Sequence, residues 1–192
     1  MIGAVPREGP LLAHLRAVTR PSHDALEDAL GLDGALDLDA YRRLLARFYG
    51  FWTGWQPQVA ALLAEERLTT PRRRLHLLAA DLTALGLSAK DLEALPRCPL
   101  TPLQDAMAAL GSLYVMEGST LGGRVIQRNL ERSLGALGAD SRSYFNGYGP
   151  ETGRMWLSFL ARLEAAPAGA AVRIGRGALA TFERLGGWLL PS

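Results

Sequence analysis

Two short segments of the chain carry residues that could do chemistry together. The first holds His23 with Glu27 four residues later, and helical spacing puts both side chains on one face. A neutral imidazole is a common metal ligand, and a carboxylate that binds its second nitrogen orients the ring and raises its basicity. Arg16 and Arg20 precede the histidine, and guanidinium groups bind carboxylates bidentately. The segment predicts a site for a metal-containing ligand that carries carboxylates; the alternative is a surface histidine paired with Glu27.

A run of small residues, about ninety positions further along, offers a different kind of surface. Gly118, Gly122 and Gly123 lie in a segment that otherwise has a helical pattern. A glycine inside a helix costs about 1 kcal/mol relative to alanine, so this cluster needs a reason. One reason is close packing of a second helix against a flat groove. The other is a planar ligand that must approach the main chain closely. With His23, the run then predicts the two walls of a heme pocket.

Helical periodicity runs along almost the whole chain and puts the two segments on separate helices. Apolar residues recur at spacings of three and four, and alternation of period two is absent. We therefore predict an all-α fold without strands. The expected helices cover residues 11–30, 37–68, 71–85, 101–130, 151–165 and 171–190, with a helical turn at 89–94 and a loop at 135–149.

Capping residues and prolines refine these boundaries. Asp37 or Asp39 is expected to cap the second helix, and Thr70 the third. Thr101 is expected to cap the fourth helix, since a proline follows at its first helical position. Prolines inside the first two helices, Pro21 and Pro57, are expected to kink or split them.

Three other features have structural rather than chemical interpretations. The second helix carries an aromatic stripe that predicts core packing: Phe48, Phe51, Trp52 and Trp55. Phe182 in the last helix could line a pocket, but a core position is the favoured interpretation. The basic run Arg72–Arg74 is expected to be a solvated first turn.

Composition limits the broad class of protein. The 192 residues suffice for one domain, which we expect to span 1–192 with a flexible N-terminal segment at 1–9. The net charge of +2 predicts neither a nucleic-acid partner nor a charged membrane surface, and no apolar run is long enough to cross a bilayer. The lone Cys98 cannot form an intramolecular disulfide, which is typical of the cytoplasm.

These residues together resemble the heme oxygenase family, and in particular its bacterial branch. The family pattern near the N-terminus is Thr-x-x-x-His-x-x-x-Glu, which Thr19, His23 and Glu27 match. The distal Gly-x-x-x-Gly-Gly pattern is matched within the run Tyr114–Gly123, which is similar to bacterial enzymes found with bacteriophytochromes. The resemblance implies a single helical domain in which heme lies between a proximal helix and a kinked, glycine-rich distal helix.

The resemblance also implies a role for each site residue. His23 would be the proximal ligand of the heme iron, and Glu27 would hold the second nitrogen of its ring. The propionates would be bound by Arg16 and Arg20, with Tyr114 as a further candidate one position out of step with the family. The residues expected to contact heme and O2 on the distal side are Gly118, Ser119, Gly122 and Gly123.

The implied activity is oxidation of heme by O2 and an external electron donor, a reductase or ferredoxin, to biliverdin, CO and iron. Heme is then both substrate and cofactor. The resemblance extends to a functional link with a bacteriophytochrome. Ser119 stands where animal members have an aspartate that orders water for proton delivery. Protons would then need water held by the main chain, or another group such as Arg124 or a tyrosine. Two alternatives remain: a carrier that holds heme without turning it over, and a helical bundle without heme in which the glycines serve packing.

Overall fold

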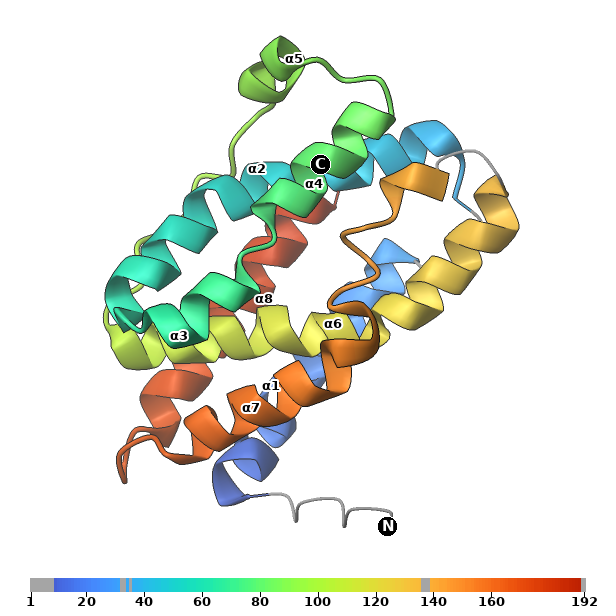
Figure 1. Ribbon diagram of the computed structural model, residues 1–192. Coiled ribbons are helices and arrows are strands. Elements are labelled where there is room, and N and C mark those ends of the chain that lie inside the picture. Colours follow the sequence, from blue (N-terminus) through green and yellow to red (C-terminus); the bar gives the residue numbers. More distant parts are fainter. Residues whose placement is uncertain (1–8, 32–33, 35, 136–138, 191–192) are drawn as a thin grey trace.

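The computed structural model describes residues 9–31, 34, 36–135 and 139–190, and over these ranges the chain is helical and contains no strand (Figure 1). The expected flexible segment 1–9 lies, apart from Gly9, outside the described residues. The α-helices are α1 (Pro10–Leu30), α2 (Leu38–Leu63), α3 (Glu66–Thr69), α4 (Leu75–Ala84), α5 (Ala89–Ala94), α6 (Ala106–Leu134), α7 (Thr152–Glu164) and α8 (Ala171–Leu189). Short 3-10 turns occur at Thr70–Arg72, Ala139–Ser141 and Gly149–Glu151. The all-α prediction is confirmed.

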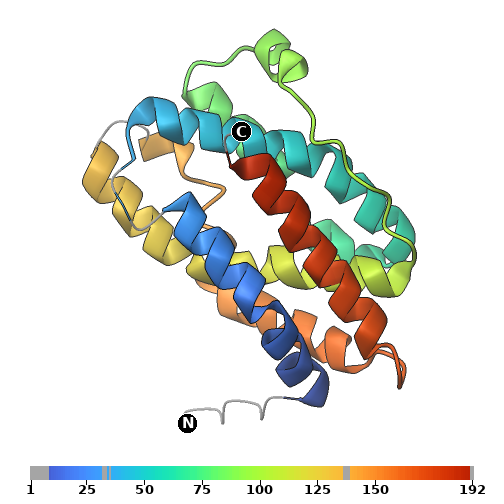
Figure 2. The same cartoon turned by 180° about the vertical axis from the view of Figure 1, so that it is seen from behind.

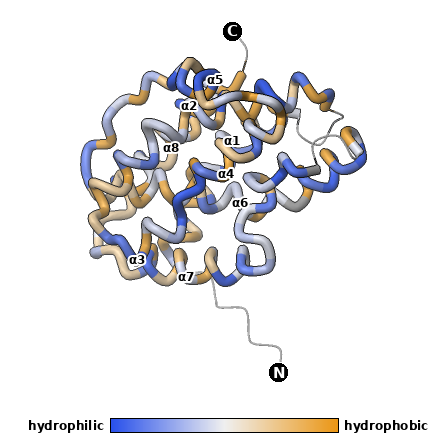
Figure 3. The backbone as a smooth tube through the Cα atoms, turned by 45° about the horizontal axis from the view of Figure 1, so that its top comes forward, coloured by the Kyte–Doolittle hydropathy of each residue, from blue (hydrophilic) through white to orange (hydrophobic). Residues whose placement is uncertain are grey.

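The helices pack around α6 and α8, which make the most extensive contact in the molecule. α1 lies against α8, α2 packs on α4 and α6, and α7 packs on α6 (Figures 1 and 2). Apolar and polar residues alternate along most helices (Figure 3), so each buries one face. The core contains the aromatic residues of α2 at Phe51, Trp52 and Trp55 together with Phe159 of α7. Over the described ranges, every helix is too short or too polar to span a bilayer.

Several helix ends lie where the local sequence predicts them. α1 ends at Gly31, which adopts a left-handed conformation with φ 55° and donates its N–H to Glu27 O. Of the two candidate caps for α2, Asp37 is the residue used, and its carboxylate accepts the N–H of Ala40 at 2.7 Å. The turn at 89–94 forms as α5, with a capping box between Ser88 and Asp91.

The prolines do not split their helices. Both Pro21 and Pro57 lie inside continuous helices, α1 and α2. The second helix nevertheless ends earlier than expected, at Leu63 instead of residue 68, because Ala64 takes a left-handed conformation with φ 50°. Residues 66–69 then form the separate short helix α3.

The starts predicted for two helices are wrong, and near each start a glutamine of α2 binds the main chain. α6 begins after Asp105 instead of Thr101, and the Asp105 carboxylate accepts the N–H groups of Met107 and Ala108. The preceding segment is held on α2, where Gln58 accepts the N–H of Leu103 at 2.9 Å. The cap that the local Thr-Pro signal predicts is therefore replaced by a different local cap, Asp105.

α4 begins at Leu75 instead of residue 71, and its N-terminus is capped from another helix. The side-chain oxygen of Gln56, on α2, accepts the N–H groups of Arg74 and Leu75 at 3.0 and 3.3 Å. Thr70, the predicted cap, lies instead in a 3-10 turn. Arg73 is extended, with φ −69° and ψ 118°, which separates that turn from α4.

The glycine-rich segment lies within one unbroken helix. α6 continues through Gly118, Gly122 and Gly123 to Leu134. Its axis changes direction near these glycines and turns away from α7 in both views (Figures 1 and 2). α6 therefore crosses the molecule as a bent helix whose glycine-bearing part faces α1.

Candidate active site

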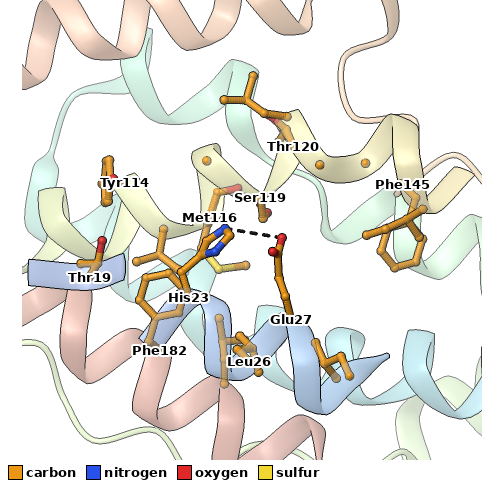
Figure 4. Close-up of a pocket in the computed structure, with 18 of the residues that line it drawn as sticks. Thr19, His23, Leu26, Glu27, Tyr114, Met116, Ser119, Thr120, Phe145 and Phe182 are labelled. Atoms are coloured by element: carbon orange, nitrogen blue, oxygen red, sulfur yellow. Dashed lines mark hydrogen bonds and ion pairs between the residues drawn. The ribbon is translucent and has the colours of Figure 1, made fainter. Parts of the chain in front are cut away.

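A cavity of about 760 Å³ lies between α1 and α6, with α8 closing one side (Figure 4). This volume is typical of a site for a large organic ligand. All nine residues singled out from the sequence line it: Arg16, Arg20, His23, Glu27, Tyr114, Gly118, Ser119, Gly122 and Gly123. The fold thus brings together two segments that are far apart in the sequence.

The wall formed by α1 presents His23 with a carboxylate at each ring nitrogen. The Nδ1 atom lies 3.2 Å from an oxygen of Asp24, and Nε2 lies 3.5 Å from an oxygen of Glu27 (Figure 4). The side chain is 47% exposed, and its ring edge faces Phe182 at a centroid distance of 6.1 Å. Whichever nitrogen binds a ligand, a carboxylate is positioned to hold the other, which fixes the tautomer.

The opposite wall is main chain. A Cβ atom added at Gly118 or Gly122 would meet nothing within 4 Å, so both glycines open onto the cavity. The packing interpretation is therefore wrong for these two residues. Gly123 differs, because its Cβ would approach the carbonyl oxygen of Phe145 to under 3 Å. Gly123 lines the cavity but also allows the loop at Phe145 to pack against α6.

The hydroxyl groups on the cavity wall are engaged by their own helices. Ser119 donates to Met116 O at 2.8 Å, and Thr120 donates to Glu117 O at 2.7 Å. On α1, Thr19 donates to Leu15 O at 2.8 Å. Because these hydroxyl groups already donate to carbonyl oxygens of their own helices, they are not available as hydrogen-bond donors to a ligand in the cavity.

The candidates for binding carboxylates lie on the outer part of the cavity. Arg16 and Arg20 are both exposed, and Arg20 donates to Asp24 at 2.7 Å. That hydrogen bond raises the pKa of Arg20 and lowers that of Asp24. Tyr114 packs against Trp156 at a centroid distance of 6.0 Å. An incoming carboxylate would therefore share Arg20 with Asp24.

The sequence analysis missed most of the apolar lining. Leu26 and Leu30 continue the face of α1 that carries His23, and that spacing was a usable signal. Phe182 is a core residue and Phe48 packs against the core, as predicted, and both also line the cavity. Phe145 also lines it, from a loop whose position no local pattern reveals.

A buried polar network behind α6 was also missed. Arg72 is only 5% exposed, and its Nε donates to the Glu117 carboxylate at 3.0 Å. Tyr148 donates to the other oxygen of Glu117 at 2.5 Å. Burial raises the pKa of Glu117, and the bonds from Tyr148 and Arg72 oppose that rise. The network anchors the helix one residue before Gly118, on the side away from the cavity.

The expectation that Arg72–Arg74 is solvated is wrong for two of its three residues. Arg73 is exposed, but Arg74 is only 3% exposed and lines the cavity. Its guanidinium donates to the carbonyl oxygen of Tyr144 and lies over that residue's ring, 4.4 Å from the centroid. A basic triplet in sequence thus contributes to three different environments.

Comparisons with known proteins agree with this geometry. Residues 9–189 match the family model described as heme oxygenase. A protein named heme oxygenase from Xanthomonas campestris pv. campestris (strain 8004) is 35% identical over 147 residues, which cover 76% of this chain and 84% of that protein. The fold is similar to that of heme-free heme oxygenase 2 from Chlamydomonas reinhardtii, with a TM-score of 0.70, 17% identity, and coverage of 96% of this chain and 100% of that one. Heme oxygenase-1 from the cyanobacterium Synechocystis sp. PCC6803 in complex with heme gives a TM-score of 0.66 and 17% identity, with coverage of 94% and 91%.

Proposed function

The chain belongs to the heme oxygenase family, and on that premise we propose that His23 binds the iron of heme while the main chain at Gly118 and Gly122 faces the other side of the ring. The protein is an enzyme that opens heme oxidatively to biliverdin, CO and iron. One observation carries the site assignment. The two glycines open onto the same cavity that His23 lines from α1.

The residues present fit a heme. A flat macrocycle needs a wall without side chains, and a Cβ at Gly118 or Gly122 would occupy the space that opens there. The iron of heme needs a neutral imidazole, and the ring of His23 has a carboxylate that can accept the N–H of the nitrogen that does not bind iron. Its propionates suit Arg16 and Arg20, which line the same cavity and are exposed.

Each part of this site has its own task in the reaction. Heme supplies the iron at which O2 is activated. His23 would bind the iron, and Asp24 or Glu27 would accept the proton on its second nitrogen. The bare main chain at Gly118 and Gly122 admits O2 and keeps it close to the ring edge. Arg16, Arg20 and Tyr114 bind the propionates and thereby fix how the ring is rotated.

The proposal for His23 is tested by its replacement with alanine. His23→Ala removes the iron ligand, and the exposed site tolerates truncation. We expect the absorption spectrum of a histidine-ligated hemin complex to disappear and turnover to fall by about 100-fold, while the melting temperature stays unchanged. His76→Ala is the matched control, because His76 is exposed on α4 away from the cavity. Full turnover by His23→Ala without added imidazole would contradict the assignment.

The alternative of a heme carrier is separated from the enzyme by one reaction. Hemin, a reductant and air are added to the purified protein, and the products are identified. An enzyme converts the Soret band of heme into the absorption of biliverdin. A carrier would keep a stable heme spectrum under the same conditions.

The partners proposed here follow from the chemistry of the reaction and from the resemblance of Tyr114–Gly123 to bacterial members. Ring opening consumes electrons that protein side chains do not supply, so an external reductase or ferredoxin is required. The same resemblance supports a cytoplasmic enzyme that supplies biliverdin to a bacteriophytochrome. Co-expression with a bacteriophytochrome apoprotein tests this link, because chromophore incorporation would then depend on an active heme oxygenase.

A further inference from the structure

The three consecutive arginines of the basic triplet differ in what surrounds them. Arg73 is exposed, and Arg72 is buried but paired with Glu117 at 3.0 Å. Arg74 is equally buried, yet no carboxylate of the described residues lies within 4 Å of its guanidinium. Three arginines from one segment therefore provide an exposed cation, a paired buried cation and a buried cation without an ion pair.

The side chain of Arg74 is only partly satisfied. One terminal nitrogen donates to Tyr144 O, and the guanidinium lies over the rings of Tyr144 and Tyr148 at 4.4 and 5.7 Å from their centroids. The Nε atom is buried and has no hydrogen-bond partner. The charge of Arg74 acts to lower the pKa of Glu117 and of Asp81, so these carboxylates offset part of the cost of burying it, but the unpartnered nitrogen leaves the guanidinium incompletely hydrogen-bonded. The Nε atom itself is enclosed by protein, but Arg74 lines the cavity, so an acceptor there can contact another part of its side chain.

Other polar groups on the inner walls are already engaged. The hydroxyls of Thr19, Ser119 and Thr120 donate to carbonyl oxygens of their own helices. The hydroxyl of Tyr144 accepts from Trp52 Nε1 at 2.8 Å, and its pKa is raised by burial. Among the described residues of the inner cavity, Arg74 Nε is the buried side-chain atom without any hydrogen-bond partner, and the Tyr144 hydroxyl, which only accepts, also has a proton to donate.

We propose that Arg74 is a positioning residue that holds a water molecule in the inner part of the cavity. This water would donate a hydrogen bond to the molecule that binds on the distal face of the heme. This inference rests on the proposed function. The guanidinium donors of Arg74 orient the water, and the nearby positive charge makes that water a better acid. The proton that Ser119 is not placed to deliver then comes from this water, which regains a proton from bulk solvent at the exposed outer part of the cavity.

The test uses ferric hemin bound to the full-length protein. In such complexes the water ligand of the iron converts to hydroxide as pH rises, and the spectrum reports the midpoint. A cation near that ligand stabilises hydroxide and lowers the midpoint. We expect Arg74→Met to raise the midpoint by about one pH unit, a tenfold change, because the charge and the donors are both lost. Arg74→Lys should stay within about 0.5 unit of the natural protein, because the charge is kept.

The neighbouring Arg73 provides a matched control. Arg73→Met should change neither stability nor midpoint, because Arg73 is exposed and is not among the residues that line the cavity. Where Arg74→Met fails to fold, Arg74→Gln replaces it and is expected to give a midpoint higher than that of Arg74→Lys.

Two results would overturn the inference. The first is an unchanged midpoint in a folded Arg74→Met or Arg74→Gln protein that binds hemin. The second is a loss of hemin affinity with an unchanged midpoint, which would make Arg74 a propionate ligand. If the hemin complex of the unsubstituted protein lacks a histidine-ligated spectrum, the proposed function itself is contradicted. That failure is distinguishable because it is seen before any Arg74 variant is measured.

Discussion

The two halves of α6 use glycine for opposite reasons. In the first half, a Cβ at Gly111 would approach main-chain atoms of α8 at Ile174 to under 3 Å, and a Cβ at Gly177 of α8 would likewise approach Ala108 of α6. These glycines let two helices touch. In the second half, Gly118 and Gly122 face open space in the cavity. One pair of absent side chains allows helix packing, and the other leaves open space in the cavity.

The comparison teaches that a glycine cluster in a helix does not reveal its purpose. Each glycine costs about the same intrinsic helix stability, close to 1 kcal/mol relative to alanine. At Gly111 that cost is offset by helix packing within the protein itself. At Gly118 and Gly122 an added Cβ would contact no atom of the described residues within 4 Å, and the proposed binding of heme in the cavity accounts for the cost.

The sharpest test of the first half is Gly111→Ala. The added methyl group would collide with the main chain of Ile174, which cannot rotate away as a side chain can, so α6 and α8 must separate. We expect the free energy of unfolding to fall by about 3 kcal/mol in a urea titration. Gly186→Ala on α8 is the control, because its Cβ meets nothing within 4 Å. An unchanged stability of Gly111→Ala would show that the helix contact is looser than described.

The corresponding test of the second half is Gly122→Leu. The side chain would extend into the cavity, so stability should change by less than about 1 kcal/mol while turnover falls by about 100-fold. CO or O2 affinity of the reduced hemin complex should fall more than hemin affinity, because the side chain is expected to block the distal side. Equal losses of both affinities would argue against a distal position for Gly122.

Gly123→Ala probes the boundary between the two uses. Its Cβ would press on the carbonyl oxygen of Phe145, and Phe145 itself lines the cavity. We expect a loss of about 2 kcal/mol in unfolding free energy together with weaker hemin binding, because the loop must shift. Chemical denaturation and hemin titration measure the two effects separately. A change in only one of them would assign Gly123 to one use alone.

The smallest effect is expected for Gly118→Ala. A single methyl group in open space should raise the stability of the heme-free protein by up to about 1 kcal/mol, since alanine favours the helix. Turnover should fall only a few-fold, less than in Gly122→Leu. A lower melting temperature without hemin would mean that Gly118 serves packing after all.

The accuracy of the sequence interpretation follows the range of the interactions involved. The end of the first helix at residue 30 and the cap at Asp37 were predicted because a left-handed residue and a capping carboxylate act on their own neighbours. The start of α4 was missed because Gln56, on another helix, binds the main chain there, whereas α6 begins at a different local cap, Asp105. Residues of the site could be named in advance where helical spacing groups them, as for His23 and Glu27.

By itself, the sequence determined an all-α fold, the helix that presents an imidazole with a carboxylate four residues later, and a helix that contains a cluster of glycines. These properties depend on spacing and on the intrinsic preferences of each residue, which act over a few positions. Only the tertiary structure decided that Gly118 and Gly122 open onto a cavity while Gly111 packs, and that Arg74 is buried there instead of solvated. Those outcomes depend on which helices and loops pack against one another across the core. The local sequence of a single segment does not determine that packing.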